Sequence, residues 1–290
     1  MSRILAAGLL VATMLGAPLA AETRAASFPS VSLGHDVNVS VELPASYADG
    51  TRNYPVLYVL HGLFEGPRFW EGRGLSAILR DLQEKKEVPE LIVVAVDGGN
   101  AFFVNGPLGR YEDLVTLELP AWVERNYRVA PGRAGRALLG VSMGGYGALR
   151  IALSHPEVFG AVATHSAMLL QQAPTPQEGA GRWHMSAFHR AFGDPIDREL
   201  WNASDPLALA ARADADSAPA LYFDCGEQDR YGLFAGNREL HARLAARGVR
   251  HEFALHPGDH GYEYVRTVLA TSLRFLGHAL AAGVPAAQGR

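Results

Sequence analysis

Short apolar runs alternate repeatedly with segments of helical spacing along this sequence. Residues 55–60 and 91–96 are continuous apolar and β-branched runs, as strands buried on both faces require. Between them, leucine and isoleucine recur at helical spacing over residues 75–86. Strands that alternate with helices form crossover units. The pattern therefore predicts a mostly parallel sheet with helices on both faces.

The same alternation continues along the rest of the chain. An edge strand is expected over 37–43, and further strands are expected over 137–141, 161–164, 220–223 and 252–255. Helices are expected over 112–127, 144–154, 233–247 and 262–280. Hydrophobic residues make up 48% of the chain and charged residues 19%, so the chain can bury a substantial core.

One interval interrupts the alternation. About fifty residues separate the strand that ends near Thr164 from the strand that begins at Ala220. A structureless connection of that length is improbable in a compact domain, so we expect an inserted cap at about 168–218 with short helices of its own. With this insertion, residues 27–284 are expected to form one domain.

The N-terminal residues are typical of a targeting signal. Arg3 precedes an apolar run over 4–15, and small residues follow over 16–21. This is the layout of a secretory signal peptide. A membrane anchor is the alternative, but the apolar stretch is short, rich in Ala and Gly, and lacks a cationic stop. We expect removal of residues 1–21, no stable membrane anchor afterwards, and a periplasmic or extracellular bacterial protein.

Charge and cysteine content exclude several functions. The net charge is −4 and the pI is about 6.3, so no basic excess is present to bind nucleic acid. The single cysteine, Cys225, permits neither an intramolecular disulfide nor a multi-cysteine metal site, and we expect it to be an inert buried thiol. The sequence contains no H-E-x-x-H motif, so no catalytic metal and no cofactor are expected.

A candidate nucleophile lies between an expected strand and an expected helix. Gly140-Val141-Ser142-Met143-Gly144 has the form G-x-S-x-G. A serine at a strained strand-to-helix turn needs neighbours without side chains, and the helix N-terminus provides amide groups where an oxyanion would form. Ser142 is therefore the expected nucleophile of acyl transfer chemistry.

A general base and an acid are expected after later strands. His260 lies in a glycine-flanked loop just before the last helix and is the expected base. The loop after the strand at 220–223 carries three carboxylates. Asp229 is the preferred acid, because Gly226 lets the loop turn back over the sheet, and Asp224 is the alternative.

The loop after the strand at 55–60 is placed to supply a second oxyanion donor. Gly62 allows the backbone to turn, so that the N–H of Leu63, or that of Phe64, points at a substrate oxygen. His61 precedes the serine in the chain, and we expect it to have a structural role.

Four segments together resemble the putative-esterase family of α/β-hydrolases, which includes S-formylglutathione hydrolases, feruloyl and acetylxylan esterases, enterochelin esterases and mycolyltransferases. They are YPVLYVLHGLFEG, GVSMGGYGALRIALSHPEVFGAV, LYFDCGEQD and PGDHGYEYV. The resemblance implies the α/β-hydrolase fold, a triad of Ser142, Asp229 and His260, and oxyanion donors at Leu63 and Met143. It also implies that residues 96–100 and 109–113 lie at the active-site mouth.

These observations predict a secreted serine esterase that acts on a small or polysaccharide-linked ester. The alternatives are an acyltransferase of mycolyltransferase type, which uses the same acyl-enzyme, and a non-catalytic binding protein of the same fold. Five aromatic residues are expected to line the substrate cleft: Phe64, Phe102, Phe103, Trp183 and Trp201. The competing interpretation is that the cap aromatics, with Phe188 and Phe192, form the cap's own small core.

Overall fold

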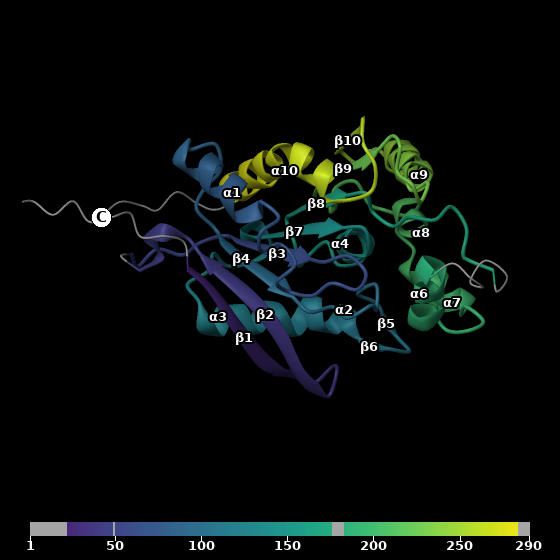
Figure 1. Cartoon of the computed structure of the whole chain (residues 1–290), viewed down its shortest axis with the longest axis horizontal. Helices are drawn as coiled ribbons and strands as arrows, with labels where there is room; N and C mark the ends of the chain where they lie inside the picture. The colour runs from purple at the N-terminus through teal and green to yellow at the C-terminus, as the bar shows by residue number, and fades with distance from the viewer. Residues whose placement is uncertain (1–21, 49, 176–182, 284–290) are drawn as a thin grey trace, which may run out of the picture.

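One central sheet of eight strands organises the protein in the computed structural model, which describes residues 22–48, 50–175 and 183–283 (Figure 1). Across the sheet the strands are β1 (Glu22–Ser30), β2 (His35–Leu43), β4 (Ile92–Val96), β3 (Val56–Leu60), β7 (Arg136–Val141), β8 (Ala161–His165), β9 (Ala220–Gly226) and β10 (His251–His256). The β1–β2 and β2–β4 pairs are antiparallel, and every other pair is parallel. The sheet is therefore mostly parallel, as predicted.

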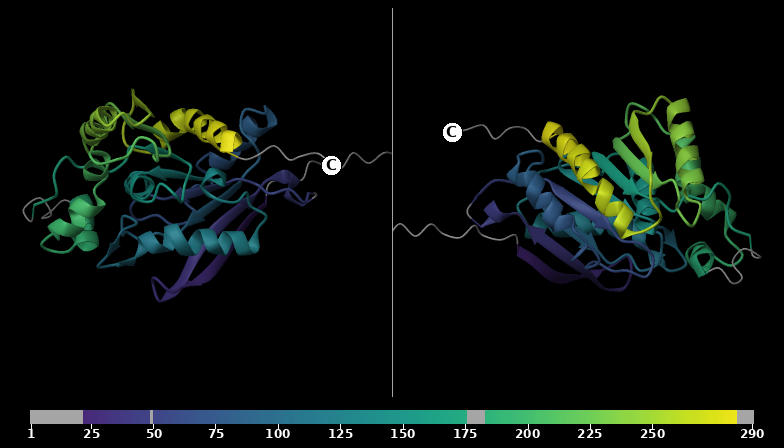
Figure 2. Two further views of the ribbon diagram at one scale, coloured as in Figure 1. Left: turned by 180° about the vertical axis from the view of Figure 1, so that it is seen from behind. Right: turned by 45° about the horizontal axis from the view of Figure 1, so that its top comes forward.

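Burial explains why the central strands read as continuous apolar runs. Every residue of β3, β4 and β8 is buried, because helices cover both faces of the sheet. In one layer, α1 (Leu75–Glu84) and α10 (Tyr262–Gly283) pack on a core that includes Leu57 and Val59. In the other, α3 (Leu119–Asn126), α4 (Met143–Ser154) and α9 (Phe234–Ala246) pack on the opposite face (Figure 2).

Short helices occupy the insertion between β8 and β9, as predicted. They are α6 (Trp183–Phe192), α7 (Arg198–Ser204) and α8 (Pro206–Ala210). In all views α6 and α7 lie at one end of the molecule (Figures 1 and 2). The Trp201 ring packs at 5.1 Å from the Phe192 ring and 5.5 Å from the Phe188 ring, centroid to centroid. Because Trp201 is only 4% exposed, these aromatics form a core beneath the insertion.

Other elements were not predicted. β1 begins before the expected start of the domain at residue 27, and a hairpin of two-residue strands forms from β5 (Asn105–Gly106) and β6 (Gly109–Arg110). The helix predicted over 112–127 consists of α2 (Tyr111–Asp113), a π-helical segment (Leu114–Glu118) and α3. Short 3₁₀ turns lie at Ala45–Tyr47 and Arg133–Gly135.

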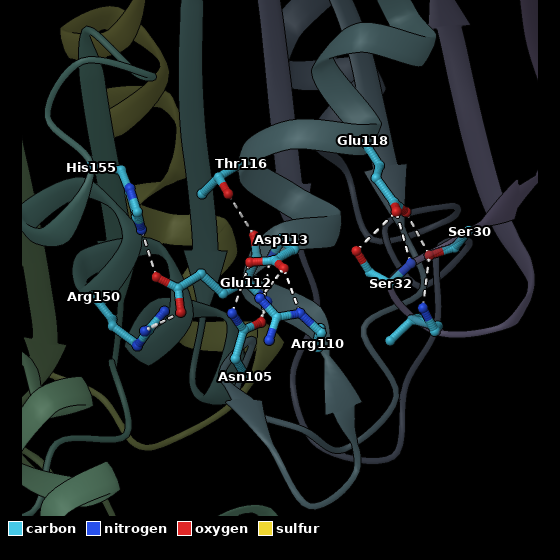
Figure 3. Close-up of polar contacts among 11 residues, drawn as sticks. Ser30, Ser32, Asn105, Arg110, Glu112, Asp113, Thr116, Glu118, Arg150 and His155 are labelled. Carbon is cyan, nitrogen blue, oxygen red and sulfur yellow. Dashed lines mark hydrogen bonds and ion pairs between the residues drawn. The ribbon is translucent and has the colours of Figure 1, made fainter.

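A buried ionic cluster ties α2 to α4. Glu112 accepts hydrogen bonds from Arg150 and His155, each over 2.5 Å, and its carboxylate lies between them in Figure 3. Arg150 also donates to the Phe103 carbonyl over 3.3 Å. Burial by itself would raise the pKa of Glu112, but the His155 hydrogen bond and the Arg150 charge outweigh it and lower that pKa to about 2. The cluster therefore fixes α4, the helix that Ser142 precedes.

Candidate active site

Ser142 occupies a tight turn between β7 and α4. Its backbone has φ 56° and ψ −115°, a conformation that non-glycine residues rarely adopt. The Ser142 N–H donates to the His165 carbonyl, and the Ser142 carbonyl accepts from the Met168 N–H, both over 3.0 Å. Bonds to the end of β8 and the segment after it therefore stabilise the strained turn, which lifts the Ser142 side chain clear of the sheet.

Two glycines permit this turn by close backbone approach. A Cβ on Gly140 would lie 2.2 Å from the Gly144 carbonyl oxygen. A Cβ on Gly144 would lie 2.2 Å from the Leu60 carbonyl oxygen, at the end of β3. Backbone cannot move aside as a flexible side chain can, so any larger residue at either position would displace the turn.

Three side chains that are far apart in the sequence meet at this turn. His260 Nε2 lies 3.1 Å from Ser142 Oγ, and His260 Nδ1 lies 2.8 Å from Asp229 Oδ2. The Asp229 side chain has no exposed surface, whereas the His260 side chain is 14% exposed. Asp229 Oδ1 also accepts the Tyr231 N–H over 2.9 Å, which fixes the carboxylate relative to the imidazole. The arrangement can pass a proton from a hydroxyl to an imidazole that a buried carboxylate orients.

A further carboxylate, which sequence reasoning missed, joins the loops that carry Asp229 and His260. Asp259 Oδ1 accepts the N–H of His260 over 2.6 Å and that of Arg230 over 2.8 Å. The Arg230 side chain pairs with the other oxygen of Asp259. The hydrogen bond from the Arg230 guanidinium, together with the His260 amide, lowers the pKa of Asp259 to about 2. The adjacency of Asp259 to His260 was the only sequence signal for this role.

Asp224, the alternative acid, has a different partner. Both of its carboxylate oxygens lie near His165 Nδ1, at 2.9 and 3.1 Å, and one also accepts from Tyr264 Oη over 2.7 Å. All three side chains are buried, and the Asp224 carboxylate is bonded to His165 and Tyr264 instead of His260. The neighbouring Cys225 is buried, and its Sγ lies 3.6 Å from Asp229 Oδ2. Burial, reinforced by the Asp229 charge, raises the pKa of this thiol far above its usual range.

The amide groups of Leu63 and Met143, on either side of Ser142, have no acceptor within the described ranges. The flanking amides in the first loop are occupied. Gly62 N–H donates to Glu65 Oε2 over 3.0 Å, and Phe64 N–H donates to Asn100 Oδ1 over 2.7 Å. The Phe64 amide is therefore committed elsewhere, and of these three consecutive amides only that of Leu63 is left to donate to a ligand.

His61 anchors the same loop from below. Its ring is fully buried, with Nδ1 2.7 Å from the Gly62 carbonyl oxygen and Nε2 accepting the Gly98 N–H over 2.9 Å. Burial lowers the pKa of His61, although the Gly62 hydrogen bond opposes this effect. A neutral ring with its proton on Nδ1 satisfies both contacts. His61 thus joins the loop after β3 to the loop after β4.

A cavity of about 170 Å³ opens beside Ser142 Oγ. It is lined mainly by apolar surface, with Leu63, Met168 and Leu233 among its walls, and by Glu65, Tyr231, Tyr262 and His260. Met168 is the only residue of the described part of the insertion in this lining. The described part of the insertion therefore packs mainly beside the cavity.

The expected aromatic lining differs from what the structure contains. Phe102 and Phe103 do not face the cleft: both rings are fully buried, so that prediction is wrong. Their backbones have φ 54° and 55°, and this turn directs the two rings into the core. Phe64 is 58% exposed on the surface. Trp201 belongs to the aromatic core described above, so the prediction that it lines the cleft is also wrong. The Trp183 side chain is not among those that the structure describes.

No three His, Cys, Asp or Glu side chains in residues 22–48, 50–175 and 183–283 gather as metal ligands. Over the same ranges, no helix has both the length and the apolar character needed to cross a bilayer.

The two loops that were predicted at the active-site mouth make different contacts. In the loop at 96–100, Gly98 and Asn100 contact the loop that carries Leu63. In the loop at 109–113, Glu112 instead contacts Arg150 on α4.

Comparison with known proteins gives the family. Esterases of Mycobacterium tuberculosis are 29% identical to the chain over 259 residues, which cover 80% of this chain and 54% of theirs. The diacylglycerol acyltransferase/mycolyltransferase Ag85A of M. tuberculosis is 27% identical over 239 residues, covering 77% of this chain and 65% of the relative. The chain thus spans about half the length of those esterases.

A solved structure of a ferulic acid esterase superposes with a TM-score of 0.75 at 26% identity, covering 90% of this chain and 99% of that one. The likeness confirms the predicted α/β-hydrolase fold. The model of the family described as putative esterase matches residues 30–276. Because this match includes the sheet, the G-x-S-x-G turn and the His260 loop, the chain belongs to the putative esterase family.

Proposed function

We propose that the protein is a serine esterase in which Ser142, His260 and Asp229 form the catalytic triad. The observation that carries the proposal is the pair of contacts that link the three side chains: 3.1 Å from Ser142 Oγ to His260 Nε2, and 2.8 Å from His260 Nδ1 to Asp229 Oδ2. Nucleophile, base and orienting acid then stand within hydrogen-bonding reach of one another, as acyl transfer requires.

The reaction follows from this geometry. Ser142 Oγ attacks the ester carbonyl carbon while its proton passes to His260 Nε2, and the carbonyl oxygen becomes an oxyanion. The free amides of Leu63 and Met143 donate to that oxygen. The bond to the alcohol breaks, and the alcohol leaves with the proton from His260. Water then attacks the acyl-enzyme, its proton passes to His260, and the acid departs as Ser142 regains its proton.

The cavity supports a short acyl group. Its volume of about 170 Å³ lies below the roughly 300–1,000 Å³ of sites that enclose drug-sized ligands. Apolar contacts from Met168 and Leu233 suit a few methylene or methyl groups. The acyl group would be attached to a small alcohol or to a polysaccharide outside the cavity. The likeness to a ferulic acid esterase makes an aromatic acyl group the competitor that an experiment must include.

Acyl transfer to another alcohol is the second candidate, which the similarity to Ag85A favours. Both reactions pass through the same acyl-Ser142, and only the acceptor differs. We also propose that residues 1–21, which lie outside the described residues, direct export to the periplasm or the medium.

The test uses the full chain and its Ser142→Ala variant. A fluorophosphonate should label only the unaltered protein. Peptide mass spectrometry should locate the label at Ser142. Acetyl, butyryl, octanoyl and feruloyl esters would then be compared by kcat/KM with and without glycerol or a sugar as acceptor. A fold used only for binding would give neither labelling nor turnover, and transfer would give a new ester in place of free acid.

A further inference from the structure

Three side chains beside the cavity have no part in the mechanism above: Glu65, Arg73 and Tyr262. Glu65 Oε2 accepts the Tyr262 hydroxyl over 2.9 Å, and Arg73 pairs with Glu65 Oε1. The Arg73 guanidinium also lies 3.8 Å from the centre of the Tyr262 ring, in a cation–π contact. These residues form one connected group, which we name the Glu65 cluster.

The cluster reaches the loop that carries the free Leu63 amide. Glu65 Oε2 accepts the Gly62 N–H over 3.0 Å. This bond fixes the peptide group between His61 and Gly62, which immediately precedes the peptide group that carries the Leu63 N–H. Tyr262 follows His260 by two residues, so its bond to Glu65 connects the first loop with the histidine loop. Glu65 and Tyr262 both line the cavity with Ser142. The carboxylate thus holds two sides of the site in register.

The same carboxylate creates an electrostatic difficulty. A Cβ built on Gly62 would lie 3.0 Å from Glu65 Oε2 and 3.8 Å from Ser142 Cβ, so the carboxylate lies close to the nucleophile. Its side chain is 19% exposed, and solvent screens it only in part. A negative charge at this position would repel the oxyanion that forms when Ser142 attacks. The hydrogen bond to Gly62 is useful to the reaction only if that charge is compensated.

We propose that Arg73 is a positioning residue that neutralises Glu65, so that the carboxylate can hold the Gly62 peptide without opposing oxyanion formation. The inference rests on the proposed role of Ser142 and the Leu63 amide. Tyr262 contributes a second donor to the carboxylate, and burial raises the pKa of its hydroxyl, so that it remains a donor throughout the working range. Arg73 is not itself among the residues that line the cavity, and it acts on the site through Glu65.

The deciding experiment measures kcat and KM for a small acyl ester, and the rate of fluorophosphonate labelling, in four variants of the full chain. In Arg73→Met the uncompensated carboxylate should lower kcat about 10- to 100-fold and leave KM within about threefold. Arg73→Lys, which keeps the charge, should retain most of the activity. Glu65→Gln should lose less kcat than Arg73→Met, because its amide oxygen can still accept the Gly62 N–H and it carries no charge that opposes the oxyanion.

The fourth variant, Arg73→Met with Glu65→Gln, separates a charge effect from lost packing. It should recover at least about tenfold in kcat over Arg73→Met, because removing the carboxylate removes the repulsion. No recovery, or a defect in KM alone, would overturn the proposal. Should Arg73→Met fail to fold by circular dichroism, Arg73→Gln takes its place in the same cycle.

Matched controls keep the two proposals apart. Arg68 forms a comparable ion pair with Glu71 nearby in the chain, but its side chain is 72% exposed. Arg68→Met should therefore leave kcat unchanged. If the unaltered protein neither labels at Ser142 nor hydrolyses esters, the proposed function fails. If it does both but the double variant does not recover, only the role of Arg73 fails.

Discussion

His165 Nδ1 and Asp224 Oδ2 lie 2.9 Å apart in a pair with no exposed surface, beneath the turn that holds Ser142. The other ring nitrogen of His165 contacts Ser272 Oγ over 3.0 Å, so α10 holds the pair from the far side. The His165 carbonyl in turn accepts the Ser142 amide. This carboxylate–imidazole pair therefore stabilises the end of β8, to which the Ser142 turn is bonded, and does not itself contact the cavity.

Asp224→Asn should therefore act mainly on stability. Removing one partner of a buried pair leaves the other uncompensated, and we expect the free energy of unfolding to fall by about 3 kcal/mol. The kcat of the folded fraction should stay within about tenfold of the unaltered protein. Urea denaturation and kinetics at 15 °C measure both. A catalytic loss of a thousandfold in a stable protein would instead make Asp224 the acid.

Asp229→Asn should show the opposite pattern. The substitution keeps the size of the side chain but no longer holds His260 in its working tautomer, so kcat should fall about 10³- to 10⁴-fold. The melting temperature should change much less than in Asp224→Asn. Comparing the two variants in one assay is the control, and a reversed ranking would exchange the two roles.

Ser142→Ala should abolish turnover while the fold survives. Loss of the nucleophile removes the whole triad reaction, and we expect kcat to fall by about 10⁴-fold or more. Circular dichroism and thermal unfolding should match the unaltered protein. Residual activity close to the original in a correctly folded variant would contradict the proposed mechanism.

The Glu112 cluster should make stability depend on pH. Lowering the carboxyl pKa from 4.5 to about 2 corresponds to about 3 kcal/mol of stability, present above pH 4.5 and lost as pH falls towards 2. The Glu112 hydrogen bond raises the pKa of His155 above 6.5, so its contribution is present below pH 6.5 and declines as pH rises through the raised value.

Glu112→Gln tests this dependence by chemical denaturation. Relative to the unaltered protein it should lose about 3 kcal/mol at pH 5.5, and the difference should narrow by about 2 kcal/mol at pH 3. Asp81→Asn is the control, because Asp81 pairs with Lys85 with both side chains 56% exposed, and it should show little effect at either pH. A difference that does not vary with pH would show that Glu112 acts by packing alone.

Trp201 and Leu233 should respond differently to truncation. Trp201→Ala empties part of the aromatic core and should cost about 3–5 kcal/mol of stability, with uniform effects on all acyl esters. Leu233→Ala enlarges the cavity and should shift the kcat/KM ratio of octanoyl to acetyl esters upward by about tenfold or more. A change of acyl preference in Trp201→Ala would return that residue to the substrate site.

Local sequence patterns correctly predicted those elements whose residues all lie in one kind of environment. The runs in β3 and β4 are apolar throughout because both faces are covered, and the predicted helix at 144–154 differs from α4 by one residue. β1 was missed because most of its described residues are exposed and alternate in burial only from Ala25 onward.

The errors in the site arise from backbone turns and long-range pairing. Nothing in the pair Phe102-Phe103 announces the two positive φ angles that bury both rings. Asp224 and Asp229 carry the same side chain and lie close together in the sequence. Only the positions of His165 and His260 in the fold distinguish their partners. The Glu65 cluster joins residues almost two hundred positions apart, so no local pattern indicates it.

The strained backbone of Ser142 bears on how relatives of this chain diverge. A residue held at φ 56° and ψ −115° costs about 1–3 kcal/mol, which glycine would largely avoid. Selection for stability alone would therefore favour glycine at this position, and only a demand on the hydroxyl retains serine. A descendant that kept the fold but lost its chemistry would be free to make that exchange. Under the proposed mechanism, the residue at position 142 would thus serve as a marker of retained activity among homologous chains.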